Sequence, residues 1–271
     1  MTRIAVNGAA GRMGQTVIET AADRDDLEVV VGFDVEAGEV DGVPVVAEDV
    51  AGALTEHDVD VVVDFSIPES TLPLAEACVE AGVGLVVGTT GFSDAGLADL
   101  EAASESVPLL KATNFSRGIQ VLQRTVREAV RALDDYDLEL MESHHNGKVD
   151  APSGTAKTLL EVVQEERDVE PVYGREGHAP RDDDEIGVFA RRAGDIRGEH
   201  ELILAGNDEV LSLSHHAEDR AVFAAGALDA AAWLSGREAG QYEFGAVVDS
   251  TRTTHIVLIY SSQYNAQPYT R

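Results

Sequence analysis

The densest set of chemically active side chains in this sequence lies between Glu142 and Ala156, in the segment ESHHNGKVDAPSGTA. It contains two adjacent histidines, His144 and His145, and a lysine, Lys148. An imidazole with its ordinary pKa of about 6.5 exchanges protons near neutral pH, so it is a common proton donor in catalysis. A lysine ammonium pairs with carboxylates. The combination predicts proton transfer to a substrate that carries negative charge.

The end of this segment predicts an anion site. Pro152 interrupts regular structure and Ser153 is a good N-cap, so we expect a helix over about 154–167. The N–H groups of Gly154 and Thr155 then point outward at the positive end of the helix dipole. A single histidine is more often structural than functional. The chain has only three lysines, however, and one of them stands in this cluster, which favours a functional site.

A glycine pattern near the N-terminus predicts dinucleotide binding. Gly8, Gly11 and Gly14 follow an expected strand over 3–7 and open an expected helix. Such glycines allow a tight turn and a close approach of the backbone to a pyrophosphate. The spacing is GxxGxxG rather than GxGxxG. Asp34 lies 20 residues after Gly14, where an acid that binds the adenosine ribose is expected.

Two further loops follow expected strands. The segment GTTGF at 88–92 comes after a strand over 85–87, and ATNFS at 112–116 comes after a strand over 107–112. Ligands bind at the carboxyl ends of parallel strands in this class of fold. The first loop alone is equally compatible with a plain turn.

The elements that must position these residues predict an α/β protein. Its 271 residues suggest about two domains. Up to residue 112, apolar strands alternate with helical patterns, which predicts a Rossmann-like, doubly wound parallel sheet covered on both faces. Near residue 116 the pattern changes. The second part combines two helices with strand-like segments and predicts an α+β domain with a mixed, largely antiparallel sheet. The expected further elements are strands over 27–33, 59–65, 138–142, 186–191, 200–205 and 209–215, and helices over 69–81, 94–105, 118–133 and 219–235.

Charge and cysteine content exclude several classes of protein. Fifty acids oppose twenty bases, giving a net charge of −30, and the acids are spread along the chain. This balance disfavours binding to nucleic acids or acidic membranes and indicates adaptation to high salt. The single cysteine, Cys78, excludes an intrachain disulfide and multi-cysteine metal sites. Because no apolar run approaches about 18 residues and glycine enters at Gly8, we expect a cytoplasmic protein without a membrane span or signal peptide.

The sequence is less compatible with three alternative functions. A cysteine-dependent semialdehyde dehydrogenase needs a nucleophilic thiol, whereas the helical spacing around Cys78 indicates core packing. A non-enzymatic redox sensor would bind the dinucleotide without needing the histidine–lysine cluster. Zinc hydrolysis is disfavoured because the adjacent pairs His144/His145 and His215/His216 face opposite ways on a strand, and no HExxH motif occurs. We expect no metal site.

The chain resembles the dihydrodipicolinate reductase family of lysine and diaminopimelate biosynthesis. The resemblance covers about residues 3–200, continues through the helix expected at 219–235, and fades after about 249. The last 22 residues contain no Asp or Glu and have no interpretation from the family. The segments that carry the resemblance are VNGAAGRMG at 6–14, DFSIPEST at 64–71, GTTGF at 88–92, NFSRG at 114–118, ESHHNGKVDAPSGTA at 142–156 and RAGDIRGEH at 192–200.

This resemblance implies NAD(P)H-dependent reduction of 4-hydroxy-tetrahydrodipicolinate to tetrahydrodipicolinate with loss of water. It also implies a role for each matched residue. His144 is the expected proton donor, and Lys148 is a second proton-donating residue that faces a carboxylate. His145, Gly154 and Thr155 match contacts to the carboxylates of this small dicarboxylate substrate. The expected cofactor-binding residues are Gly8, Ala9, Ala10, Gly11, Arg12 and Met13 for the pyrophosphate, Asp34 for the ribose, and Gly88, Thr89, Thr90, Ala112, Thr113, Asn114 and Phe115 beside the nicotinamide.

The resemblance also implies an organisation of domains and subunits. Residues 1–115 and 219–271 are expected to form the dinucleotide-binding domain, and residues 116–218 the substrate-binding and oligomerisation domain. The family is typically a homotetramer built through the second domain's sheet. Asp34 repels a 2′-phosphate, and Val35 stands where many members carry arginine, so we expect NADH to be preferred over NADPH. Arg12 or another arginine could still reach the phosphate.

Overall fold

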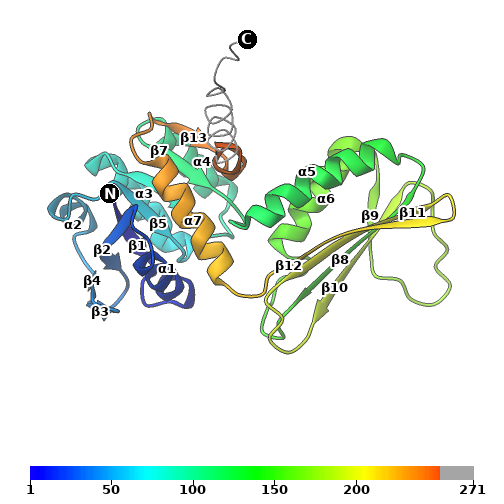
Figure 1. The fold of residues 1–271 in the computed structure, drawn as a ribbon, viewed down its shortest axis with the longest axis horizontal. Coiled ribbons are helices and arrows are strands. Elements are labelled where there is room, and N and C mark those ends of the chain that lie inside the picture. Colours follow the sequence, from blue (N-terminus) through cyan, green and yellow to red (C-terminus); the bar gives the residue numbers. More distant parts are fainter. Residues whose placement is uncertain (251–271) are drawn as a thin grey trace, which may run out of the picture. The chain divides into compact units, whose positions relative to one another are not determined.

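The sheet of the first unit collects strands from both ends of the chain (Figure 1). The computed structural model describes residues 1–250 and divides them into one unit of 1–112 with 227–250 and another of 113–226. Neighbouring strands in the first unit are parallel except for β3 and β4. In order across the sheet the eight strands are β13 (Gly240–Tyr242), β7 (Pro108–Lys111), β6 (Gly84–Val87), β5 (Val61–Asp64), β1 (Thr2–Asn7), β2 (Leu27–Phe33), β4 (Val43–Val46) and β3 (Gly38–Val40).

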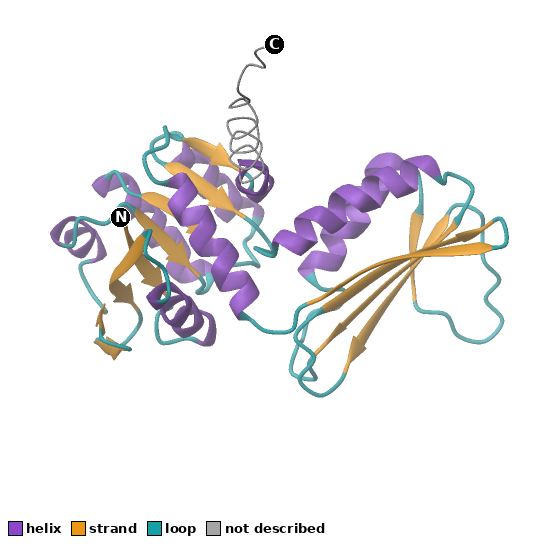
Figure 2. Cartoon of the chain, viewed as in Figure 1, coloured by secondary structure: helices purple, strands orange, loops and turns teal. Residues whose placement is uncertain are grey.

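Helices cover both faces of this sheet (Figure 2). One apolar cluster joins α2, α3 and α4 to the sheet and includes Leu54, Leu74 and Leu100. On the opposite face α1 and α7 lie side by side. Arg24, which follows α1, donates a hydrogen bond to Asp229 of α7 at 2.8 Å. The central strands β5 and β6 are buried along their whole length, as the apolar sequence predicts, and the doubly wound parallel sheet is confirmed. The helices are α1 (Arg12–Ala22), α2 (Val50–Glu56), α3 (Pro68–Ala81), α4 (Asp94–Ser104) and α7 (Ala221–Leu234).

The second unit contains a five-stranded sheet that is mixed, as predicted, but not largely antiparallel, because two of its four strand pairings are parallel. Strand β11 is antiparallel to β8 and β12, whereas β10 is parallel to β8 and β9. The strands are, in order across the sheet, β12 (Glu209–His216), β11 (Glu199–Gly206), β8 (Asp137–His144), β10 (Glu185–Arg192) and β9 (Glu170–Tyr173).

Helices α5 (Arg117–Ala132) and α6 (Gly154–Glu166) pack on one face of that sheet (Figure 2). Alternate strand residues such as Leu140 and Leu202 point toward these helices and form a core with them. The opposite face carries no helix in the described part of this unit. Within residues 1–250 no helix is both long enough and apolar enough to cross a membrane.

Several short elements were not predicted from the sequence. They are α2, β13, the β3–β4 hairpin and β9. Strand β13 pairs with β7, so residues after 227 extend the first sheet. Residues 251–271, which the sequence expectation also assigned to the first domain, lie outside the described residues.

Candidate active site

The glycine loop of the first unit is shaped by close backbone contacts. Gly8 has a φ of 76°, and a Cβ there would lie 2.6 Å from the carbonyl oxygen of Phe65. A Cβ on Gly14 would lie 2.1 Å from the carbonyl oxygen of Gly8. Only glycine therefore fits at either position. Helix α1 begins after Gly11, which has no side chain to cap it, so the first N–H groups of the helix are available to an anion.

Asp34 is joined to this loop by hydrogen bonds. It lies just after β2, and its carboxylate accepts from the backbone N–H of Ala10 at 2.9 Å and of Val35 at 2.8 Å. The structure thus brings together the acid and the glycine loop that the sequence spacing suggested. Val35 is 90% exposed, so its side chain leaves the surroundings of the carboxylate open.

A buried carboxylate, Asp64, organises the neighbouring loops, and sequence reasoning gave it no role. It is inaccessible to solvent and accepts hydrogen bonds from Asn7, Ser66, Thr71 and Thr89, at distances of 2.6–2.7 Å. These bonds tie together the ends of β1, β5 and β6. The hydroxyl of Thr89 also accepts from the N–H of Ser66, so that side chain fixes the loop. The sequence feature that could have identified Asp64 is its position as an acid at the end of an otherwise apolar strand.

The next glycine in this region makes room for an aromatic ring. A Cβ on Gly88 would lie 2.2 Å from the ring of Phe65, so the ring packs directly on the backbone of the loop. Thr90, by contrast, is exposed. Among the expected cofactor residues of the first unit, Gly88, Thr89 and Thr90 therefore form one loop at the carboxyl end of β6, where ligands bind in parallel sheets.

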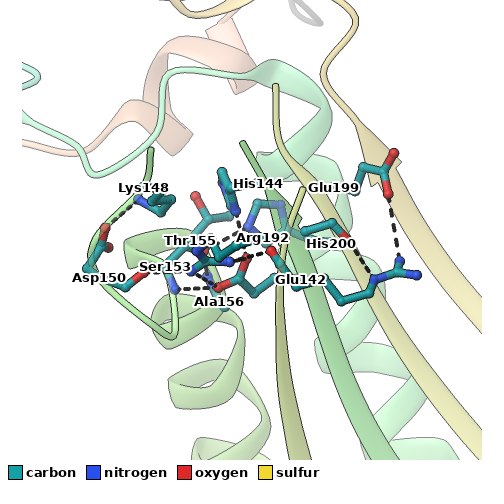
Figure 3. A network of polar contacts seen from close by, with 12 residues as sticks. Glu142, His144, Lys148, Asp150, Ser153, Thr155, Ala156, Arg192, Glu199 and His200 are labelled. Atoms are coloured by element: carbon teal, nitrogen blue, oxygen red, sulfur yellow. Dashed lines mark hydrogen bonds and ion pairs between the residues drawn. The ribbon is translucent and has the colours of Figure 1, made fainter. Parts of the chain in front are cut away.

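In the second unit a polar network surrounds the end of β8 (Figure 3). Glu142 is inaccessible to solvent. Its Oε2 receives hydrogen bonds from Arg192 Nη1 at 2.8 Å and pairs with His144 Nδ1 at 2.6 Å. Its Oε1 receives hydrogen bonds from Arg192 Nη2 at 2.7 Å and from the N–H of Ser153 at 3.0 Å. One buried carboxylate therefore links the expected proton donor to the residue that begins α6.

The surroundings of His144 change its basicity. Burial lowers the pKa of His144, and the hydrogen bond with Glu142 opposes burial without reversing it. The positive charges of Lys148 and Arg192 lower the pKa further. The free protein therefore holds the proton on His144 less tightly than an isolated imidazole does. Lys148 itself is paired with Asp150 at 2.8 Å.

The start of α6 is held from three sides. Ser153 caps it by accepting from the N–H of Ala156 at 3.2 Å, and the same hydroxyl bonds to His200 Nε2 at 3.0 Å. Asn114 donates to the hydroxyl of Thr155 at 2.9 Å. Gly154 and Thr155, the two expected anion-binding residues, thus stand at a helix start that is held by several hydrogen bonds. Their role in binding a carboxylate stays a prediction.

Other expected site residues are placed less directly. In the part of the chain that the structure describes, the side chain of His145 has no hydrogen bond or ion pair, and it lies half-buried in the turn before Lys148. Thr113 and Asn114, expected beside the nicotinamide, lie against α6, whereas Phe115 is buried and Ala112 is half-buried. Their proximity to a cofactor stays a prediction.

The structure also argues against a nucleophilic cysteine. Cys78 is fully buried in α3, and burial raises the pKa of its thiol far above the usual range. The thiolate, which is the reactive form, is therefore suppressed. Within residues 1–250, no group of three or more His, Cys, Asp or Glu side chains is placed to hold a metal ion.

Sequence reasoning also gave no role to Glu142, Arg192 or His200. One signal was present, because Glu142 ends the expected strand over 138–142 and His144 lies two residues further on, so both share a face once β8 continues to His144. Arg192 and His200 reach the cluster only through the pairing of β8 with β10 and β11, which their spacing along the chain does not reveal.

Comparison with known proteins covers nearly the whole chain. Residues 2–115 match the family described as dihydrodipicolinate reductase, N-terminus, and residues 118–248 match dihydrodipicolinate reductase, C-terminus. A 4-hydroxy-tetrahydrodipicolinate reductase of Haloarcula marismortui is 72% identical over 92% of this chain and 100% of its own length. One from Natronomonas pharaonis is 52% identical over 89% and 98%. A dipicolinate-bound dihydrodipicolinate reductase from Paenisporosarcina shares the fold, with a TM-score of 0.74, 23% identity and coverage of 90% and 97%.

Proposed function

Because this chain belongs to the dihydrodipicolinate reductase family, we propose that it reduces 4-hydroxy-tetrahydrodipicolinate to tetrahydrodipicolinate, with loss of water, at the expense of NAD(P)H. The reaction belongs to lysine and diaminopimelate biosynthesis. One observation carries the proposal most directly. His144 and the start of α6 are held by the same buried carboxylate, Glu142, so a proton donor stands beside a carboxylate-binding site.

The first unit fits a dinucleotide cofactor. The backbone around Gly8 and Gly14 leaves no space for a Cβ, and the first turn of α1 offers uncapped N–H groups to a pyrophosphate. Asp34 lies against this loop and would accept from the ribose hydroxyls. When bound, the reduced nicotinamide supplies the hydride for the reaction.

The second unit supplies the groups that recognise a dicarboxylate. The N–H groups of Gly154 and Thr155 bind one carboxylate, and Lys148 and His145 approach the other. Lys148 would exchange its partner Asp150 for the substrate, because both offer a carboxylate to the same ammonium. These cations matter because a chain with a net charge of −30 repels a dianion at long range.

His144 delivers the proton. Reduction of the conjugated imine gives an enamine, and the negative charge that builds on the ring system must be neutralised by a general acid. The protonated imidazole of His144 provides this proton, and Lys148 shares in its delivery. The two carboxylates of the bound substrate raise the proton affinity of His144, which offsets the effect of Lys148 and Arg192 in the free protein.

We also infer a preference for NADH. The carboxylate of Asp34 accepts hydrogen bonds from two ribose hydroxyls but repels a 2′-phosphate, and Val35 offers no positive charge beside it. Arg12 at the start of α1, whose side chain is exposed, is the alternative cation for such a phosphate.

The uncovered face of the second sheet is the proposed subunit interface of a homotetramer. Met141, Phe189 and Ile203 point away from α5 and α6, because their strand neighbours belong to the core beneath those helices. Apolar side chains on an uncovered sheet face favour contact with a second copy. Light scattering after size-exclusion chromatography measures the mass directly. A monomer at all salt concentrations would contradict the tetramer.

The activity is tested by following NADH oxidation in a reaction coupled to the preceding synthase, which supplies the substrate. We expect turnover that depends on that synthase and that rises with KCl, because the net charge of −30 indicates adaptation to high salt. We also propose that the protein is located in the cytoplasm. The same assay separates the enzyme from a non-enzymatic dinucleotide-binding sensor. Binding of NADH without any turnover, at low and high KCl, would favour the sensor.

A further inference from the structure

We propose that Glu142 is a positioning residue that fixes the proton of His144 on Nδ1, so that Nε2 is the atom that exchanges protons with substrate. Arg192 completes the device by holding the Glu142 carboxylate in place. The inference rests on the proposed function only for the identity of the substrate. The placement of the proton is a property of the protein alone.

The hydrogen bonds of Glu142 use its full capacity as an acceptor. A carboxylate has about four lone-pair sites, and Glu142 faces four donor groups, two at each oxygen. Arg192 occupies one site on each oxygen, so the planar guanidinium fixes the plane of the carboxylate (Figure 3). His144 and the N–H of Ser153 take the remaining sites. A neutral amide could not satisfy this arrangement.

The charge state of Glu142 decides the tautomer of His144. Burial raises the pKa of Glu142, but hydrogen bonds from Arg192 and His144 outweigh burial and leave the pKa below its usual value. An ionised carboxylate accepts hydrogen bonds and cannot donate them. At 2.6 Å the contact must therefore be Nδ1–H donating to Oε2. Nε2 remains, and it stands 3.2 Å from where a Cβ of Gly198 would lie, so this glycine leaves that nitrogen space.

The ionisable groups around His144 come from four elements. Glu142 on β8 is negative, and Lys148 in the following loop and Arg192 on β10 are positive. His200 on β11 lies with its ring centroid 5.3 Å from that of His144. Burial lowers the pKa of His200 to about 3, so it is neutral during catalysis. The negative and positive neighbours therefore act on His144 in opposite directions.

Because Glu142 and Arg192 carry opposite charges, their removal should shift the pH profile in opposite directions. A purely structural role of Glu142 would not produce such shifts. In Glu142→Gln the imidazole of His144 loses its negative partner, which lowers its pKa. The pH at which kcat/KM falls on the alkaline side should therefore move downward. In Arg192→Gln it loses a positive neighbour, so that pH should move upward. We expect kcat to fall by about 10²-fold in Glu142→Gln, because a general acid supplies roughly that much. Shifts in the same direction, or none, would overturn the proposal.

A double variant tests whether Glu142 acts through His144. If it does, the kcat of Glu142→Gln combined with His144→Ala should be no lower than that of His144→Ala alone, because His144→Ala removes the imidazole that Glu142 positions. The comparison uses kcat because Glu142 also holds the start of α6, where a change would appear in KM. Multiplicative losses would overturn the inference. NADH affinity, measured in each variant, should remain that of the parent, because the proposed dinucleotide site lies in the first unit. A parent-like cooperative unfolding transition in each variant shows that the second unit is folded.

The tautomer can also be read without any activity. Nitrogen-15 NMR of histidine-labelled full-length protein, at a pH where His144 is neutral, should show the Nδ1–H form in the parent. His144→Ala identifies the signal. Glu142→Gln should show a larger share of the Nε2–H form, and an Nε2–H form in the parent would overturn the proposal even if Glu142→Gln does not fold. An inactive parent with Nδ1–H on His144 would contradict the proposed function and leave this inference standing.

Discussion

His200 and His215 lie directly opposite each other on β11 and β12, and each imidazole forms a 3.0 Å hydrogen bond with a serine that begins a helix. His200 bonds to Ser153 at α6, and His215 bonds to Ser116 at α5. One cross-strand pair therefore fixes the starts of both helices that cover the second sheet. For α6 this contact supports the expected carboxylate site.

The first prediction concerns stability at mildly acidic pH. Burial lowers the pKa of His200 to about 3, whereas an unfolded histidine titrates near about 6.5. Between these values the unfolded chain binds a proton that the folded chain does not. The contribution of His200 to the free energy of unfolding is therefore complete above pH about 6.5 and is lost, by about 1.4 kcal/mol per pH unit, as the pH falls.

Chemical denaturation at fixed KCl between pH 7 and 5 measures this dependence. In His200→Gln the slope of unfolding free energy against pH should be shallower by roughly that amount. His178→Gln makes the same change at an exposed position in the second unit and should leave the slope as in the parent. Equal slopes in the parent and in His200→Gln would show that His200 does not carry the effect.

The second prediction concerns the proposed catalytic pair. His144→Ala should lower kcat by about 10²-fold or more, because it removes the general acid. Lys148→Ala should raise KM as well as lower kcat, since its ammonium binds substrate in both the ground and transition states. His178→Ala and Lys157→Ala change exposed residues of the same types and serve as controls. Near-parental kcat in both active-site variants would show that the site is misplaced.

The third prediction compares two pH profiles. Burial, together with Lys148 and Arg192, keeps the pKa of His144 below its usual value in the free protein. A bound dicarboxylate adds negative charge and raises it. Since kcat/KM reports the free enzyme and kcat reports the complex, kcat should begin to fall at a higher pH than kcat/KM does. Coincident profiles would mean that the negative charge of the bound substrate does not raise the pKa of His144.

The fold was largely predictable because its main elements carry strong local patterns. Continuous apolar runs identified β1, β2, β5 and β6, and their alternation with helices indicated a parallel sheet. The Asp41–Gly42 turn of the β3–β4 hairpin also had a signal, since both residues take a positive φ and such pairs favour tight hairpins. The sequence of strand β9 carries no such signal, because Pro171 stands inside the strand and its pairing with β10 comes from tertiary structure.

The site was predictable where neighbours in sequence act together. His144, Lys148 and the start of α6 lie within one segment, and local rules for caps and imidazoles suffice to find them. Arg192 lies 50 residues from Glu142, and Asn7 lies 57 residues from Asp64. Such partners meet only through strand pairing. Single-sequence patterns therefore reveal candidate catalytic groups more readily than the groups that hold them in place.

The fourth prediction concerns the cofactor. The parent should show a higher kcat/KM with NADH than with NADPH, because Asp34 repels a 2′-phosphate. Val35→Arg should raise kcat/KM for NADPH by about 10-fold, since a charged hydrogen bond to phosphate contributes at least about 1.5 kcal/mol. Val35 is 90% exposed, so Val35→Gln is a neutral control that should leave the ratio unchanged. A parental preference for NADPH would contradict the assignment of Asp34.

The last prediction concerns salt. A net charge of −30 makes the folded state repel itself at low ionic strength. Raising KCl from about 0.1 M to molar concentrations shortens the screening length from about 10 Å to about 3 Å, so Tm and kcat/KM should both rise. A triple change of Asp182, Asp183 and Asp184 to Asn removes three exposed charges and should make the dependence shallower. The same three positions changed to Glu keep the charge and should reproduce the parent. If Tm is the same in dilute buffer and in molar KCl, self-repulsion does not govern the stability of this chain.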